Sequence, residues 1–139
     1  MFTLFTGAAG AAPQKPAVNS TADGVAVRGY DVVAYHDGQA VEGDARYERV
    51  WNGARWRFSS AANRDRFAAA PEKFAPQFGG YCAYAVSRGY TADIDPKAFK
   101  IVDGALYLNY SLGVQRSWER DVQGNIVKGR QHWPAVLNK

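Results

Sequence analysis

Apolar and polar positions alternate on both sides of a central Asn52-Gly53 dipeptide in residues 47–58. Period-2 alternation is typical of β-strands that bury one face. Asn-Gly suits the tight two-residue turn of a hairpin because both of its residues tolerate positive φ. The aromatic positions are Tyr47, Trp51, Trp56 and Phe58. We therefore expect two antiparallel strands, each with one aromatic face.

A helix is expected directly after this hairpin. Ser59 and Ser60 offer hydroxyl oxygens that can cap the first free N–H groups, and the run SAANRDRFAAA follows. Phe67 and Phe74 are seven residues apart and can therefore face the same way. Pro71 stops or bends the helix because it lacks a backbone N–H and clashes with the preceding turn.

The flanking regions predict further short elements. Residues 25–36 indicate two short strand segments broken at Gly29, and YCAYAVSR before Gly89 indicates a short helix. Asp103-Gly104 predicts a second hairpin. Ser111 is expected to cap a last helix, broken at Gly124-Asn125, and Pro134 is expected to end the ordered part.

Together these elements predict an α+β fold, a small antiparallel sheet of hairpins with short helices packed on it. The 139 residues suffice for one modest core, assigned to residues 25–139. Residues 1–24 are rich in Ala, Gly, Pro, Thr and Ser, and indicate a flexible segment or the remnant of a secretory signal with a cleavage region near Ala8 to Pro13. No apolar run is long enough to span a bilayer, so no membrane span is expected.

The net charge of +4 raises the question of a nucleic-acid surface, because cations interleaved with aromatic rings serve that purpose. Arginines cluster at positions 46, 49, 55, 57, 64 and 66. Acidic residues interrupt them at positions 44, 48, 65 and 72. The pattern therefore favours solvated faces, and no nucleic-acid partner is expected.

The sequence offers no obvious catalytic constellation. Ser59 and Ser60 have no histidine nearby in sequence, and the Gly-Gly-Tyr-Cys run at 79–82 lacks the lysine and spacing of a phosphate-binding loop. We therefore expect a protein that is not an enzyme.

Cys82 is the only cysteine, so an intramolecular disulfide is excluded. It can serve as a metal ligand, as a reactive thiol, or as a small buried core residue. His36, at the end of an apolar run, is either a second metal ligand or a surface imidazole. The only methionine is Met1, so methionine supplies no ligand inside the fold.

The run FSSAANRDRF at 58–67, followed by APEKF at 70–74, resembles the core of the YHS domain family. GYDVVAY at 29–35, QFGGYCAYAVSRG at 77–89 and VDGALYLNYSLGVQRSW at 102–118 resemble its free-standing exported bacterial branch. The likeness extends from about Val25 to Pro134. It implies a small treble-clef-like, metal-associated module and a periplasmic or exported protein; without a signal, the protein would be cytoplasmic.

The sequence departs from the metal-binding members of that family at the positions of their three cysteines. Those positions correspond here to Ala34, Ser59 and Asn63. Alanine cannot ligate a metal, and a neutral hydroxyl or amide is a poor ligand for copper or zinc. We infer that the family's thiolate site is absent, with Ser59 and Asn63 acting as helix-capping and turn residues.

Three hypotheses follow from these observations. The resemblance favours an accessory role in copper or zinc handling in the cell envelope, with the ion held by Cys82 and His36. The first alternative is a metal-free scaffold that binds a small molecule or a protein in an aromatic pocket. The second is a thiol redox protein that uses Cys82. The pocket residues of the first alternative are Tyr35, Trp56, Tyr81 and Tyr84.

Overall fold

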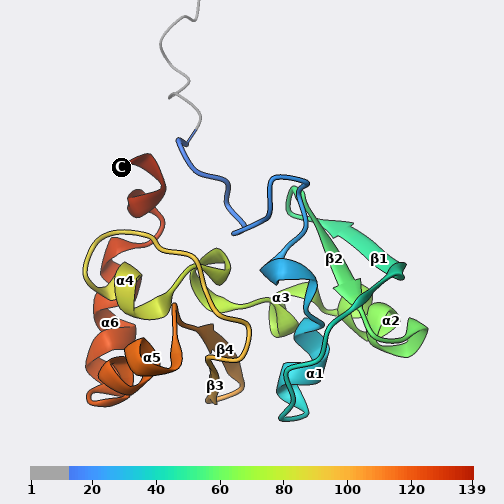
Figure 1. The fold of residues 1–139 in the computed structure, drawn as a ribbon. Coiled ribbons are helices and arrows are strands. Elements are labelled where there is room, and N and C mark those ends of the chain that lie inside the picture. The colour runs from blue at the N-terminus through green and yellow to red at the C-terminus, as the bar shows by residue number, and fades with distance from the viewer. Residues whose placement is uncertain (1–12) are drawn as a thin grey trace, which may run out of the picture.

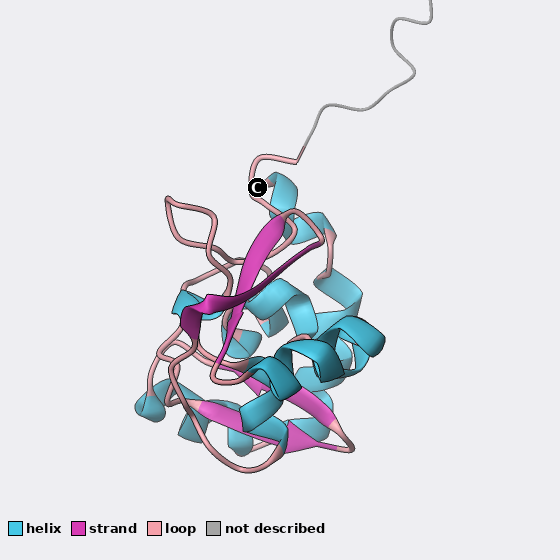
Figure 2. Cartoon of the chain, turned by 90° about the vertical axis from the view of Figure 1, so that its right-hand side faces the viewer, coloured by secondary structure: helices cyan, strands magenta, loops and turns pink. Residues whose placement is uncertain are grey.

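Two separate antiparallel hairpins supply the named strands of the computed structural model, which describes residues 13–139. Short helices make up the other regular elements, so the predicted α+β class is confirmed. In Figure 1 the N-terminal half of the chain lies on the right, and the helices of the C-terminal half lie on the left. Figure 2 shows the two hairpins apart from each other, with helices packed around both.

The first hairpin joins β1 (Asp44–Trp51) to β2 (Ala54–Phe58) as the alternation predicted. Asn52 and Gly53 form the turn with φ of 49° and 77°, which confirms the positive φ expected of both. The side chains of β2 alternate between buried and partly exposed, and the buried ones include Trp56 and Phe58. This alternation directs the aromatic face of β2 into the core.

The predicted helix after this hairpin is α2 (Ala61–Ala69). Its cap is Ser60, whose Oγ accepts the Asn63 N–H at 3.1 Å. The helix ends before Pro71, which opens α3 (Pro71–Phe74). Phe67 and Phe74 are both buried in the same core cluster, although the chain leaves the helix at Ala70 and places them in two different helices.

The prediction of strands in residues 25–36 is wrong. This stretch forms the 3₁₀ helix η1 (Val27–Gly29) and the helix α1 (Val32–His36). The carboxylate of Asp31 accepts the N–H groups of Val33 and Ala34 and so caps α1. A short apolar run fits a buried strand or a buried helix equally well, and this cap favours the helix.

The C-terminal half contains the second hairpin and three α-helices. Its elements are η2 (Gln77–Gly80), α4 (Ala83–Ser87), β3 (Phe99–Val102), β4 (Ala105–Leu108), α5 (Leu112–Glu119), α6 (Val122–His132) and η3 (Ala135–Asn138). Asp103 and Gly104 form the predicted turn with φ of 51° and 79°. Ser111 caps α5 by accepting the Val114 N–H at 3.1 Å, also as predicted.

Two expectations for this half are wrong. Gly124-Asn125 does not break the last helix but lies inside α6. The break comes earlier, because the Asp121 side chain accepts the Gly124 N–H at 3.0 Å and caps a new helix. The chain also stays ordered after Pro134, where η3 buries Val136.

The buried side chains form two clusters rather than one. The first is centred on Trp56, Phe58 and Phe67 and gathers residues from η1, α1, the first hairpin and α2, with some from β4. The second gathers Phe78, Tyr107, Trp118 and other residues of the C-terminal half. The molecule therefore has two packed halves, which contact each other through α1 with β3 and through α3 with β4.

Residues 13–24 lie against both halves. Val18 is buried, the Lys15 N–H donates to the Leu137 carbonyl at 3.0 Å, and the Asn19 N–H donates to the Gly79 carbonyl at 2.8 Å. A Cβ at Gly79 would lie 2.1 Å from the Ala17 carbonyl oxygen, so this contact requires glycine. Apart from Pro13, the predicted cleavage region near Ala8 to Pro13 lies outside the described residues.

Residues 13–139 include no helix with the length and apolar character needed to cross a membrane.

Candidate functional site

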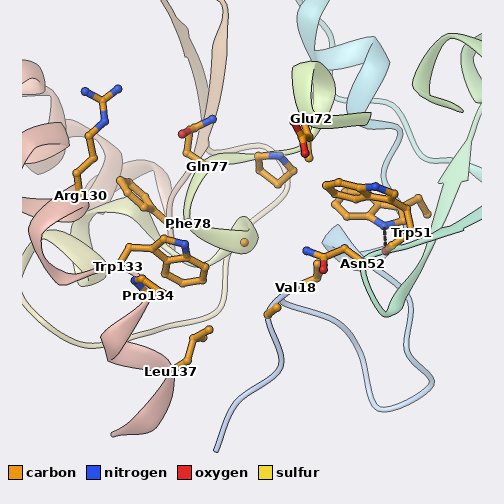
Figure 3. Close-up of a pocket in the computed structure, with 15 residues that line it drawn as sticks. Val18, Trp51, Asn52, Glu72, Gln77, Phe78, Arg130, Trp133, Pro134 and Leu137 are labelled. Atoms are coloured by element: carbon orange, nitrogen blue, oxygen red, sulfur yellow. Dashed lines mark hydrogen bonds between the residues drawn. The ribbon is translucent and has the colours of Figure 1, made fainter. Parts of the chain in front are cut away.

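A cavity of about 430 Å³ lies where the two halves meet. Its volume is within the range of about 300–1,000 Å³ that is usual for small-molecule sites. Trp51 and Trp56 line it from the first hairpin, and Phe78 and Trp133 line it from the C-terminal half (Figure 3). We call this cavity the aromatic cleft.

The hairpin wall of the aromatic cleft is held rigidly. Trp51 is the last residue of β1, and its carbonyl oxygen accepts the Trp56 indole N–H at 2.9 Å (the dashed line in Figure 3). The two indole rings lie 5.7 Å apart between centroids. Phe67 of α2 packs against both, at 5.7 Å and 5.1 Å. Offset and tilted ring pairs at such distances are favourable, so this wall is preorganised.

The opposite wall depends on an unusual backbone conformation. Phe78 has φ of 58°, in the left-handed region that costs a residue with a side chain about 1–3 kcal/mol. Its ring packs against Trp133, with centroids 6.2 Å apart, and against Tyr107 at 6.0 Å. A Cβ at Gly129 of α6 would lie 2.5 Å from the Phe78 ring, so glycine at this position makes room for it. The strained conformation therefore places a ring in the wall.

The polar side chains that line the aromatic cleft are Asn52, Glu72, Gln77 and Arg130. Within residues 13–139, Glu72 and Arg130 form no ion pair, and the side chains of Asn52, Glu72 and Gln77 form no hydrogen bond. The Arg130 guanidinium lies near the Tyr107 hydroxyl; burial raises the pKa of Tyr107, and this guanidinium opposes that rise. The cleft thus presents one carboxylate and two amides without a hydrogen-bond partner among the described residues, and one guanidinium that also contacts the Tyr107 hydroxyl and has further N–H donors for a ligand.

Cys82, the expected metal ligand or reactive thiol, is a buried residue at the start of α4. Its side chain is 1% exposed. The thiol donates to Asn109 Oδ1 at 3.5 Å, and the sulfur accepts the Tyr110 N–H at 3.2 Å. Burial raises the pKa of the Cys82 thiol even though nearby backbone N–H groups act to lower it. The structure thus favours the thiol over the thiolate.

His36, the expected second ligand, lies at the end of α1 and contacts Phe74 rather than Cys82. Its Nε2 donates to the Phe74 carbonyl at 3.4 Å, and its ring meets the Phe74 ring edge-on at 5.3 Å. Burial lowers the pKa of His36. Figure 1 shows α1 and α4 well apart. In the described part of the chain, no group of three or more His, Cys, Asp and Glu side chains is placed to hold a metal ion.

The three positions that the resemblance assigns to thiolates converge on the carboxylate of Asp31. The Ala34 N–H donates to it at 3.2 Å, the Ser59 hydroxyl at 2.7 Å and the Asn63 side-chain amide at 2.8 Å. A hydrogen-bonded cluster therefore joins α1 to the start of α2. Ser59 and Asn63 bind Asp31 rather than capping α2 with their side chains, which Ser60 does.

Sequence reasoning did not single out Asp31, although an aspartate directly before the apolar run VVAY is a recognisable helix N-cap signal. The partners from Ser59 and Asn63 come from 28 and 32 residues away, and no local pattern indicates them.

Of the four residues expected to line an aromatic pocket, Trp56 lines the aromatic cleft. Tyr35 is fully buried and its hydroxyl donates to the Pro96 carbonyl at 2.5 Å. Tyr81 is also buried; its hydroxyl donates to the Pro16 carbonyl at 2.8 Å, and its ring lies beside Trp133. Tyr84 lines a different cavity, of about 290 Å³, together with Cys82.

The sequence analysis missed Trp51, Phe78 and Trp133 as pocket residues. Trp51 carries a local signal, because it immediately precedes the Asn-Gly turn on the aromatic face of its strand. Phe78 and Trp133 carry none, since their positions depend on a left-handed backbone and on the packing of α6.

Comparisons of the chain with protein-family models, with curated proteins and with solved structures find no match. The lining of the aromatic cleft contains no cysteine, histidine, serine or lysine among the described residues, and its ionisable groups are Glu72 and Arg130. Aromatic walls with a few polar groups are typical of a site that binds and orients an organic ligand.

Proposed function

We propose that this protein is a non-enzymatic binding protein and that the aromatic cleft is its ligand site. The observation that carries the proposal is a cavity of about 430 Å³ between two packed halves, lined by three of the four tryptophans of the chain. Such rings bury a large apolar area with little loss of side-chain freedom, which favours flat or aromatic ligand groups.

The resemblance to the YHS family supports the same type of function, a small binding module of the cell envelope. The metal-handling form of that proposal has less support from the geometry, because the Cys82 sulfur is buried and hydrogen-bonded and His36 contacts Phe74. Titration of zinc into the wild type and into Cys82→Ser compares the two forms. A thiolate-dependent heat would favour the metal role.

The proposal is tested with indole, a neutral aromatic probe, titrated into the ¹⁵N-labelled protein. The four tryptophan indole N–H signals serve as reporters. Trp51, Trp56 and Trp133 line the cleft, whereas Trp118 is fully buried in the second cluster and serves as an internal reference. We expect the three cleft signals to shift with one saturable dissociation constant, while the Trp118 signal stays in place.

Trp133→Ala is expected to weaken indole binding about two- to twelvefold, since an aromatic pair contributes about 0.5–1.5 kcal/mol beyond its area burial. Tyr110→Ala is the matched control, because Tyr110 is 59% exposed and lines the other cavity. No saturable shift up to the solubility limit of indole, or equal shifts of all four signals, would contradict the proposal.

A further inference from the structure

The two ionisable side chains of the aromatic cleft come from opposite halves of the molecule. Glu72 belongs to α3 and Arg130 to α6. Figure 3 shows them at separate ends of the cleft, with Gln77 between them. Neither charge has an ion-pair partner within residues 13–139. A ligand that complements both must carry a cation and an anion separated by a spacer.

Gln77 defines the chemistry of that spacer. Its side-chain amide offers both a donor and an acceptor and makes no hydrogen bond within the described part of the chain. A peptide bond presents the complementary pair, one C=O and one N–H. The ring walls formed by Trp51 and Trp133 stand next to this row and suit an aromatic side chain.

We propose that the aromatic cleft binds short peptides that have a free amino end, a free carboxyl end and an aromatic side chain. The carboxylate pairs with Arg130, the ammonium group pairs with Glu72, and the peptide bond between them pairs with Gln77. This inference rests on the proposed function, since it specifies the ligand of the same cleft.

The test uses the full chain and the tripeptide Ala-Phe-Ala, with the indole signals of the cleft as reporters. Three matched peptides remove one feature each: the C-terminal amide removes the anion, the N-acetyl form removes the cation, and Ala-Ala-Ala removes the ring. Each is expected to bind about five- to tenfold more weakly than the parent, because each loses one charge-assisted or aromatic contact.

Arg130→Gln and Glu72→Gln connect each end of the peptide to its partner. Arg130→Gln is expected to weaken the parent peptide about five- to tenfold but to leave the affinity for the C-terminal amide unchanged, and Glu72→Gln is expected to do the same for the N-acetyl form. Lys128→Gln is the matched control, because Lys128 is an exposed cation on the same helix that does not line the cleft.

The inference is overturned if the parent and its two blocked forms bind equally, or if Arg130→Gln weakens all peptides alike. Indole separates this failure from failure of the proposed function. If indole binds but the peptides show no end-group preference, the cleft remains a binding site and its ligand is not a peptide of this kind. If neither indole nor the peptides shift the cleft signals, both proposals are refuted.

Discussion

Replacing Asp31 with alanine tests how much of the stability depends on one buried carboxylate. Asp31 is 0% exposed, and five donors surround it: the N–H groups of Val33, Ala34 and Ser59, the Ser59 hydroxyl and the Asn63 amide. The carboxylate therefore caps α1 and joins it to the segment that begins α2.

The magnitude follows from these contacts. Loss of the cap on α1 costs about 1 kcal/mol. Each of the three hydrogen bonds to Ser59 and Asn63 contributes about 1.5–3 kcal/mol, because the acceptor is charged. The low end of this range applies because Ser59 is exposed, so water can replace some of the lost hydrogen bonds. Since such contributions do not add fully, we expect Asp31→Ala to lower the free energy of unfolding by about 4 kcal/mol. That is a large share of the roughly 5–15 kcal/mol typical of a domain.

Urea unfolding followed by far-UV circular dichroism measures this loss by linear extrapolation. Asp23→Ala is the control, because Asp23 is exposed, and a change within about 0.5 kcal/mol is expected. Ser59→Ala should cost about 1.5 kcal/mol in the wild type and almost nothing in the Asp31→Ala background. A loss below about 1 kcal/mol for Asp31→Ala, or an equal cost of Ser59→Ala in both backgrounds, would refute the reasoning.

Four further predictions concern single side chains. Phe67→Ala should lower the free energy of unfolding by about 3–5 kcal/mol in the same urea assay, since the ring is fully buried beneath the hairpin wall. Gly129→Ala should destabilise the protein, instead of giving the gain of about 0.5–1 kcal/mol usual in an open helix, because its Cβ would clash with Phe78. Cys82 should react slowly with a disulfide reagent at pH 8 in the folded protein and quickly in urea, because burial raises the pKa of its thiol and blocks access; equal rates would count against this. Burial lowers the pKa of His36 in the folded state, so the unfolded chain takes up the proton first as pH falls below about 6.5, and stability should decrease there in the wild type more than in His36→Gln.

The elements that the sequence predicted correctly are those encoded by neighbouring residues. Asn52-Gly53 and Asp103-Gly104 both form hairpin turns with positive φ, and Ser60 and Ser111 both cap helices. Turn and cap signals act within three or four residues and so can be read from the chain directly.

The two wrong element predictions have different causes: the first involves contacts between distant residues, and the second involves a local cap three residues before Gly124. The apolar run after Asp31 was interpreted as strand because its pattern fits either element, whereas the observed helix is fixed by its cap and by partners about 30 residues away. Glycine at position 124 predicts a break because glycine often marks one, but Asp121 caps a helix that includes it.

The candidate site could be predicted only in part, because its walls come from residues that are far apart in the sequence. An aromatic pocket that includes Trp56 follows from the aromatic face of the first hairpin. Its opposite wall comes from Phe78 and Trp133, and the approach of these residues depends on how the two core clusters pack. Periodicity along the chain contains no information about that packing.

The backbone at Phe78 shows how stability and site geometry compete in this fold. The next two residues, Gly79 and Gly80, also have positive φ, which glycine adopts without strain. A chain that required only this turn would be less strained with glycine at position 78 as well. Phenylalanine at this position adds backbone strain of about 1–3 kcal/mol. The packing of its ring under Gly129 and against Tyr107 offsets this strain. What the fold gains is a ring fixed in the wall of the aromatic cleft, opposite the tryptophans of the hairpin, and this supports a binding role for the cleft.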